Sequence, residues 1–174
     1  MPLQQRGAPI VIVQPGGVTG PGDTSPQNDV YKFFLRRMPI MFGATAGLTW
    51  AHVDDIAEGH ILAMEKGRAG EAYIIAGPTM TYQQTMQAFE TITGIPAPKI
   101  WAPDWMTIGT GKLMGLLERV FNARLSISAE ALSTLANYTW YVTSAKAQRE
   151  LGWQTRPIEQ TFKEVLDYER ARMK

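Results

Sequence analysis

The glycine-rich segment at 14–23 has the clearest capacity to bind a ligand. It reads Gln-Pro-Gly-Gly-Val-Thr-Gly-Pro-Gly-Asp, with glycines at 16, 17, 20 and 22. A dinucleotide-binding turn needs the spacing G-x-G-x-x-G and a helix that begins at once, and the segment has neither. Pro21 also removes a backbone N–H that a phosphate-binding loop would use. Taken alone, the segment is typical of a structural loop rich in glycine and proline.

A second polar cluster, formed by His52, Asp54 and Asp55, stands where an apolar segment meets a helical pattern. Either aspartate can cap the helix, because carboxylates are stabilised at the positive N-terminal end of a helix. His52 and Asp55 are also metal-ligand types, but the sequence has only two histidines and no cysteine, so no metal site is predicted. The segment 109–113 is not a phosphate-binding P-loop, since Leu113 stands where Ser or Thr is required.

The composition describes the protein that must position these residues. The chain has 174 residues, 45% of them hydrophobic and 19% charged, which suits a single globular domain with a sizeable core. A net charge of +1 gives no electrostatic reason to expect nucleic acid or an anionic membrane as a partner. The absence of cysteine rules out disulfides and fits a reducing cytoplasm. The most apolar helical stretch, 105–121, is interrupted by charges and is too short to span a membrane.

Strands alternate with helices along the chain, which predicts an α/β fold whose second half is mostly helical. Thr81 is expected to cap one helix and Gly94 to end it, and Ser144 is expected to cap another. Strands are predicted at Pro9–Val13, Leu48–Val53, Ala72–Ala76 and Thr139–Val142, and helices at Asp29–Arg37, Asp54–Lys66, Tyr82–Thr93, 103–121, Ala129–Asn137, 145–151 and Ile158–Arg172.

The run Pro9–Val13 is short, apolar and β-branched, as in a strand that is buried on both faces. Such a strand needs a neighbour on each edge, because buried backbone groups without partners are costly. The sequence offers few other strands of this kind. We therefore expect a fragment of a larger sheet, and self-association into a homo-oligomer that covers the open edge.

Four segments together resemble the extended short-chain dehydrogenase/reductase family of NAD-dependent epimerases and dehydratases. They occur in the family's order and span nearly the whole chain. The similarity is greatest to the dihydroflavonol-reductase-like and hopanoid-associated sugar-epimerase-like branch. The segments are Val13–Asp23, which follows the family's sixth strand, Trp50–His60, with a His-Val-x-Asp helix start, Glu71–Gly77, which resembles the next strand, and Ser144–Trp153, with a Leu-Gly-Trp signature.

The resemblance implies a C-terminal fragment of a doubly wound Rossmann-type sheet with a helix-rich substrate-binding subdomain. It places Pro15, Gly16, Gly17 and Val18 beside the nicotinamide end of NAD or NADP. By the same resemblance, Gln14 and Asp23 contact a small-molecule substrate. These six residues are the site residues that we carry forward.

The family's catalytic Tyr-x-x-x-Lys pair and glycine-rich first turn are absent from the sequence. We therefore assign no catalytic residue and expect no tight binding of NAD or NADP by this chain alone. Nucleotide-sugar members commonly carry an arginine at the position of Leu48, and another in a stretch that here, over 125–148, has none. This favours a less charged alcohol, ketone or sugar-like substrate, since arginine is the usual bidentate ligand of phosphate. The alternative is a non-catalytic domain that binds a ligand or a protein and retains the family shape.

Overall fold

A computed structural model describes residues 7–103 and 141–173, together with positions 105, 106, 109, 110, 113 and 139. The chain forms two compact units. The described part of the first unit comprises residues 7–23, 49–79 and 141–173, and that of the second lies within 24–48 and 80–139. Each unit has its own core. That the whole chain folds as one domain stays a prediction.

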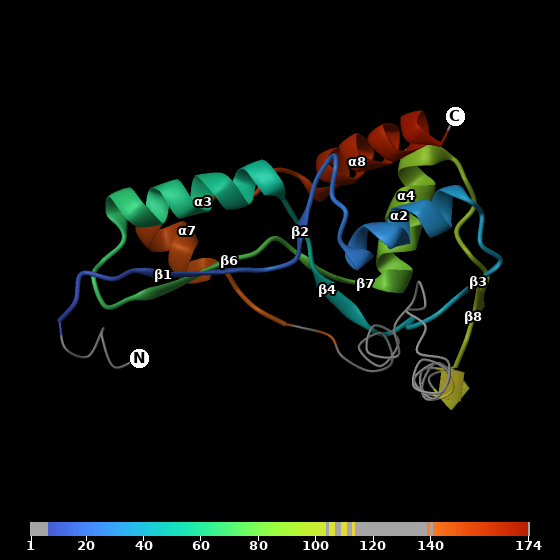
Figure 1. The fold of residues 1–174 in the computed structure, drawn as a ribbon, viewed down its shortest axis with the longest axis horizontal. Helices are drawn as coiled ribbons and strands as arrows, with labels where there is room; N and C mark the ends of the chain where they lie inside the picture. Colours follow the sequence, from blue (N-terminus) through green and yellow to red (C-terminus); the bar gives the residue numbers. More distant parts are fainter. Residues whose placement is uncertain are drawn as a thin grey trace, which may run out of the picture. The chain divides into compact units, whose positions relative to one another are not determined.

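The first unit is built on a parallel β–α–β crossover (Figure 1). Strand β1 (Ile12–Pro15) pairs in parallel with β6 (Ala72–Ile75), with Ile12 opposite Ala72. Helix α3 (Val53–Lys66), which immediately precedes β6 in the chain, packs against both strands. A second parallel pair, β2 (Val18–Thr19) with β5 (Ala51–His52), lies where β1 leads into the loop and where α3 begins. This is the arrangement of a Rossmann-type crossover.

Helix α3 lies close to the sheet because small residues face it. Gly59 is buried against β6, and a Cβ at this position would lie 2.6 Å from Ile75. The helix begins one residue earlier than predicted, and its N-cap is His52, whose Nδ1 accepts a hydrogen bond from the Asp54 backbone at 3.2 Å. The prediction that Asp54 or Asp55 caps this helix is therefore wrong. His52, the residue before the helix, supplies the cap because its ring nitrogen reaches the backbone N–H of the second helical residue.

Strand β1 is less buried than predicted. Val11, Ile12 and Val13 are half-buried, and Ile10 and Gln14 are exposed. The prediction of a strand buried on both faces is wrong for the described part of the chain, because within it β6 is the only strand that pairs with β1. The strand also begins later than predicted, at Ile12 instead of Pro9.

Two helices close the first unit. Helix α7 (Ala145–Leu151) lies beside α3 and β6, and α8 (Ile158–Arg172) packs against the β5 region through an edge-to-face contact of Phe162 with Trp50. The bounds of α8 match the prediction. Ser144 occupies the predicted cap position of α7, but its side chain makes no capping hydrogen bond to that helix. Its hydroxyl accepts a hydrogen bond from the Ala76 N–H at 2.8 Å and donates one to the Ala76 carbonyl at 2.5 Å. The buried serine thus fixes the end of β6.

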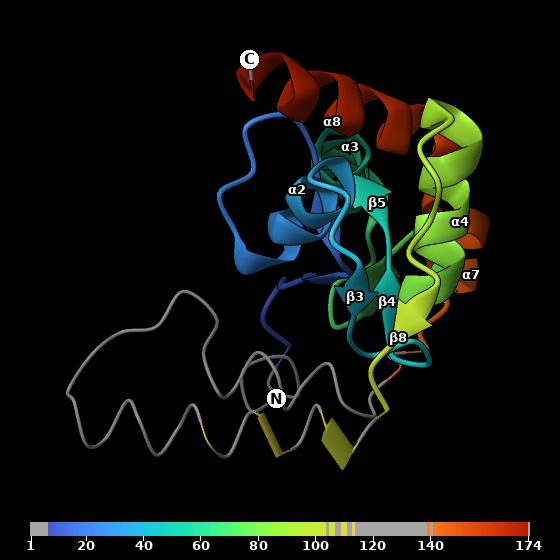
Figure 2. The same cartoon turned by 90° about the vertical axis from the view of Figure 1, so that its right-hand side faces the viewer.

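The second unit has an aromatic core between two helices. Figure 2 shows the course of both helices, labelled α2 and α4. Helix α2 (Asp29–Leu35) follows a short 3-10 turn, η1 (Pro26–Asn28), and places Tyr31 and Phe34 against Phe89 of helix α4 (Tyr82–Thr93), with ring centroids 4.8 and 5.3 Å apart. The cap predicted for α4 is confirmed. The Thr81 hydroxyl accepts from the Gln84 N–H, the Gln84 side chain accepts from the Thr81 N–H, and Gly94 ends the helix with a φ of +72°.

Short strands complete the second unit. Strand β3 (Ile40–Met41) pairs in parallel with β8 (Ile100–Trp101), and β4 (Gly47–Thr49) pairs with β7 (Thr79–Thr81). The single strand predicted at Leu48–Val53 is divided between β4 and β5. Of the strand predicted at Thr139–Val142, the described residues show one bridge between Thr139 and Gly47.

The helices predicted at 103–121 and Ala129–Asn137 lie essentially outside the described residues. In the part of the chain that is described, no helix is long and apolar enough to cross a membrane.

Candidate substrate- and cofactor-binding site

The six predicted site residues lie where β1 leads into the following loop. Gln14 and Pro15 are exposed at the end of the strand, and the next three residues, Gly16, Gly17 and Val18, are half-buried. Asp23 is also half-buried and ends a turn, in which its backbone N–H donates a hydrogen bond to the Gly20 carbonyl at 3.2 Å. Ligands of open parallel sheets bind beyond the carboxyl ends of the strands, and this loop occupies such an end. The structure thus groups residues 14–18.

The two adjacent glycines pack against their own chain. The Gly16 N–H donates to the Ile75 carbonyl at 2.8 Å, and the Gly17 N–H donates to the Thr49 hydroxyl at 3.0 Å. A Cβ at position 16 would contact the Thr49 hydroxyl and lie 2.6 Å from the Ala76 Cβ. Because both amide donors are already bound, this segment offers a ligand a close backbone surface and no phosphate cradle.

The rest of the loop follows the start of α3. A Cβ on Gly20 would lie 2.7 Å from Val53 Cγ1, so the backbone of the loop touches the first residue of the helix. Gly22 adopts a φ of +85°, a conformation that favours glycine. A Cβ at Gly22 would lie 3.6 Å from the Tyr168 hydroxyl of α8, so the loop also passes close to that helix. The loop is therefore fixed at two points beyond β2.

A network of charged side chains supports the start of α3. Arg156 donates through Nε to Asp55 Oδ1 at 2.8 Å and through its backbone N–H to Asp55 Oδ2 at 2.9 Å. The Trp153 indole donates to the Asp55 carbonyl at 2.7 Å. Asp54 and Glu164 also lie within 4 Å of the guanidinium, at 3.6 and 3.7 Å. Asp55 thus joins α3 to the segment between α7 and α8. Sequence reasoning missed Arg156, because neither spacing nor composition distinguishes it from a solvated arginine.

The two histidines do not converge on a metal site. His52 is buried, with Nε2 3.5 Å from Glu164 Oε2, while His60 is exposed on α3 and its Nδ1 lies 2.8 Å from the Ile56 carbonyl. Among the described residues, no group of three or more His, Cys, Asp or Glu side chains could hold a metal ion.

Two tyrosines lack the surroundings of a catalytic proton donor. Burial raises the pKa of Tyr82 to about 12, which is opposite to the direction that a proton-transferring tyrosine needs. Tyr73 is buried beside Lys146, but the ammonium lies over the ring, 4.6 Å from its centroid, and bonds Glu71 instead. The Tyr73 hydroxyl donates to Glu150 at 3.1 Å. Tyr73 therefore lacks the geometry of a tyrosine–lysine catalytic pair.

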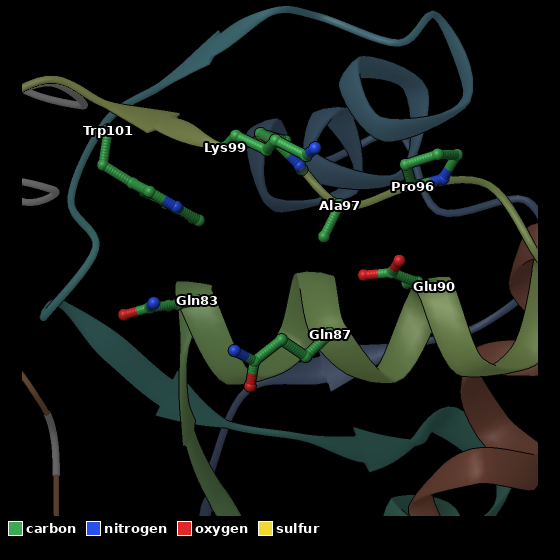
Figure 3. A pocket seen from close by; sticks show the side chains of 8 residues that line it. Gln83, Gln87, Glu90, Pro96, Ala97, Lys99 and Trp101 are labelled. Carbon is green, nitrogen blue, oxygen red and sulfur yellow. The ribbon is translucent and has the colours of Figure 1, made fainter.

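A groove in the second unit was not predicted from the sequence (Figure 3). It has a volume of about 200 Å³ and lies between α4 and the segment that leads into β8. Amide, carboxylate and ammonium groups and one indole ring line the groove, so it offers hydrogen-bond donors and acceptors to a small polar molecule. Its lining comprises Gln83, Gln87, Glu90, Pro96, Ala97, Pro98, Lys99 and Trp101. No sequence motif marks these residues, because separate segments of the chain build the groove.

The chain matches curated proteins over nearly its whole length. A protein of Synechocystis sp., provisionally named as a dihydroflavonol 4-reductase, is 29% identical over 171 residues, or 94% of this chain and 49% of that protein. Sterol demethylase protein B of Methylococcus capsulatus is 29% identical over 171 residues, or 96% of this chain and 52% of that protein. The chain spans about half the length of the curated relatives it matches. No protein-family model matches it.

Two solved structures share the fold. The crystal structure of gox2253 is 26% identical with a TM-score of 0.73, covering 98% of this chain and 52% of that one. UDP-glucuronic acid 4-epimerase from Bacillus cereus, solved in complex with NAD, is 19% identical with a TM-score of 0.66, covering 99% and 48%. The predicted class, part of a Rossmann-type α/β fold, is confirmed. Within that class, the predicted resemblance to the extended short-chain dehydrogenase/reductase family of NAD-dependent epimerases and dehydratases is confirmed as a similarity over nearly the whole chain.

Proposed function

We propose that this chain supplies the substrate-binding part of an NAD(P)-dependent reductase or epimerase that acts on a secondary alcohol, a ketone or a sugar-like molecule. The observation that carries the proposal is the match of 171 residues to a protein named as a reductase. The position of the 14–18 segment at the carboxyl end of a parallel strand supports it.

The residues divide by what they can offer. Exposed Gln14 provides an amide that donates and accepts hydrogen bonds to a substrate hydroxyl or carbonyl. Pro15 to Val18 form a close wall suited to the flat nicotinamide ring, since their glycines approach the neighbouring strands and their amides at 16 and 17 are already bound. Asp23 accepts from a second hydroxyl. When bound, NAD or NADP supplies or takes up the hydride.

The chain's own residues favour a substrate of low charge. Leu48 and the arginine-free stretch at 125–148 leave two positions without the guanidinium groups that hold a diphosphate. A neutral substrate needs only the amide and carboxylate groups proposed above. This part of the proposal rests on sequence positions.

Nuclear magnetic resonance tests the proposed cofactor contact on the chain as it exists. Titration with NAD to millimolar concentrations is expected to shift the amide signals of Gly16, Gly17 and Val18, weakly and without saturation below about 1 mM. Gly94, which ends α4 in the second unit, serves as the reference signal. If the largest shifts arise elsewhere, the assignment of this loop to the cofactor is wrong.

The nucleotide sequence upstream of the codon for Met1 separates the proposal from its alternative. An in-frame glycine fingerprint followed by Tyr-x-x-x-Lys supports the reductase or epimerase. An in-frame sequence without either motif favours a non-catalytic domain that binds a ligand or a protein.

A further inference from the structure

The groove in the second unit has one wall on helix α4 (Figure 3). Gln83, Gln87 and Glu90 follow one another at intervals of four and three residues, which places them on one face of the helix. All three are exposed, whereas Thr85 and Phe89 are buried on the other side. Among the described residues, the side chains of Gln83 and Glu90 have no hydrogen-bond or ion-pair partner, so their polar groups are available to a ligand.

The other wall is an extended segment with alternating side chains. Ala97, Lys99 and Trp101 are each two residues apart and line the groove. Ile100, which lies between the last two, does not line it and is 58% exposed. Figure 3 shows Ala97 and Trp101 pointing toward α4 from this segment. Trp101 is half-buried and belongs to β8, where it pairs with Met41 of β3.

Both walls are fixed by the structure of the second unit. The capping box of Thr81 and Gln84 holds the start of α4, and the stacking of Phe89 on the aromatic core holds its buried side. Pro96 and Pro98 restrict the backbone of the facing segment. A site that is already formed loses little conformational entropy when it binds a ligand.

The lining groups suit a neutral molecule with an apolar face and a hydroxylated rim. Glu90 and Lys99 contribute one charge of each sign, so the groove favours neither an anion nor a cation. The two glutamine amides both donate and accept hydrogen bonds, as hydroxyl groups do. The indole of Trp101 offers an electron-rich face to polarised C–H groups. The volume of about 200 Å³ lies below the roughly 300–1,000 Å³ of pockets for drug-sized ligands, so it suits a single ring.

We propose that this groove binds one pyranose ring of a neutral carbohydrate. Trp101 packs against the C–H face of the ring, and the side chains of Gln83, Gln87 and Glu90 bond to its hydroxyl groups. The lining residues belong to the second unit, whereas the loop at 14–23 belongs to the first. The proposal therefore does not rest on the proposed enzymatic function.

Nuclear magnetic resonance titration of the 174-residue chain tests the site with the methyl pyranosides of glucose, galactose and mannose. At least one is expected to bind with a dissociation constant of about 1–10 mM, because a single ring makes few contacts in a shallow groove. The signals expected to shift are the indole N–H of Trp101 and the side-chain amides of Gln83 and Gln87. Gly152, which ends α7 in the first unit, serves as the reference. Glucuronate, which adds a carboxylate to the same ring, is expected to bind no more tightly than the neutral glucoside.

Substitutions on both walls test the assignment of residues. Gln87→Ala and Trp101→Ala are each expected to weaken binding about fivefold or more, because a hydrogen bond or the stacking surface is lost. Gln87 is exposed within α4, so its replacement by alanine should leave the circular dichroism spectrum unchanged, and this variant decides alone if Trp101→Ala does not fold. Thr91→Ala, at an exposed position of the same helix outside the groove, is the control and should bind as the wild type does.

Three results would overturn the proposal. The first is that none of the three neutral glycosides binds with a dissociation constant below about 50 mM. The second is binding that shifts signals outside the groove or that Gln87→Ala leaves at full strength. The third is binding of glucuronate about tenfold tighter than that of the neutral glucoside, since charge and not the hydroxylated ring would then determine recognition.

Discussion

At the scale of single residues, glycine and polar side chains near β1 have distinct tasks. Gly16 and Gly17 allow the chain to approach Thr49 and Ala76, whereas Gln14 extends from the strand end into solvent. A residue that supports the loop and a residue that contacts substrate should therefore respond differently to substitution. Stability measurements and kinetics separate the two roles.

Substitution of Gln14 should affect catalysis and not stability. In a complete enzyme that contains this chain, Gln14→Ala is expected to raise KM or lower kcat severalfold, because a substrate hydrogen bond is lost. The melting temperature should change little, since the side chain is exposed. Steady-state kinetics and calorimetry measure the two effects. A large loss of stability with normal kinetics would make Gln14 a structural residue.

Substitution of Gly16 should affect stability. Gly16→Ala introduces a methyl group 2.6 Å from the Ala76 Cβ, so the loop or β6 must shift. The free energy of unfolding is expected to fall by about 1–3 kcal/mol, as for other overpacked sites. Gly109→Ala, at a helical position with nothing within 4 Å, is the control and should not lower it, because alanine favours a helix over glycine. Urea denaturation measures both; equal effects would contradict the close packing.

Tyr82 should make the stability of the chain depend on alkaline pH. Burial raises the pKa of its phenol to about 12, above the unfolded value of about 10. Its contribution is fully present below pH 10 and is lost as the pH rises toward 12. At pH 11 the loss is on the order of 1 kcal/mol. Tyr82→Phe should be less sensitive to pH between 8 and 11 than the wild type in urea denaturation. Equal sensitivity would mean that the phenol titrates normally.

At the scale of helices and strands, the sequence correctly predicted features that depend on residues close together in the chain, such as helix caps and helix bounds. Thr81 caps α4, Gly94 ends it, and α8 has the predicted bounds, because capping and helical periodicity are properties of adjacent residues. The burial of β1 and the role of Asp55 could not be predicted in this way. The burial of β1 depends on which strands pair with it. The role of Asp55 depends on its bond to Arg156, which is 101 residues away in the sequence. The candidate site loop was proposed only through its family resemblance.

The bond between Asp55 and Arg156 should hold α3 to the segment before α8. Asp55 is buried and accepts two hydrogen bonds from Arg156, so Asp55→Ala leaves the guanidinium without its main partner. The free energy of unfolding is expected to fall by about 2–3 kcal/mol, less than for a fully buried pair because Arg156 is partly exposed.

The exposed pair Lys163–Asp167 on α8 provides the control. Its atoms are only 2.6 Å apart, yet both side chains are more than half exposed. Asp167→Ala is therefore expected to cost less than about 0.5 kcal/mol. Chemical denaturation of the two variants compares them directly. If Asp167→Ala destabilises the chain as much as Asp55→Ala, burial does not set the strength of these bonds.

At the scale of the whole molecule, the chain contains the proposed substrate- and cofactor-binding loop but no assigned catalytic group. The sequence has neither Tyr-x-x-x-Lys nor the glycine fingerprint, and the raised pKa of Tyr82 makes its phenol a weaker acid than an ordinary tyrosine. Under the proposed function, binding of substrate and transfer of hydride are therefore expected to be separable. The purified chain can be tested for the second alone.

The purified 174-residue chain is expected not to catalyse hydride transfer. Without a positioned proton donor, a carbonyl substrate loses the general-acid contribution, typically about 10²–10⁴-fold in rate. Without the fingerprint loop, the dinucleotide is not held against the 14–18 wall. Absorbance at about 340 nm follows NADH or NADPH oxidation with neutral ketones and sugars as substrates. The control is the same reaction with heat-denatured chain. Turnover far above that background would mean that residues other than the family pair perform the chemistry, and that our assignment of roles is wrong.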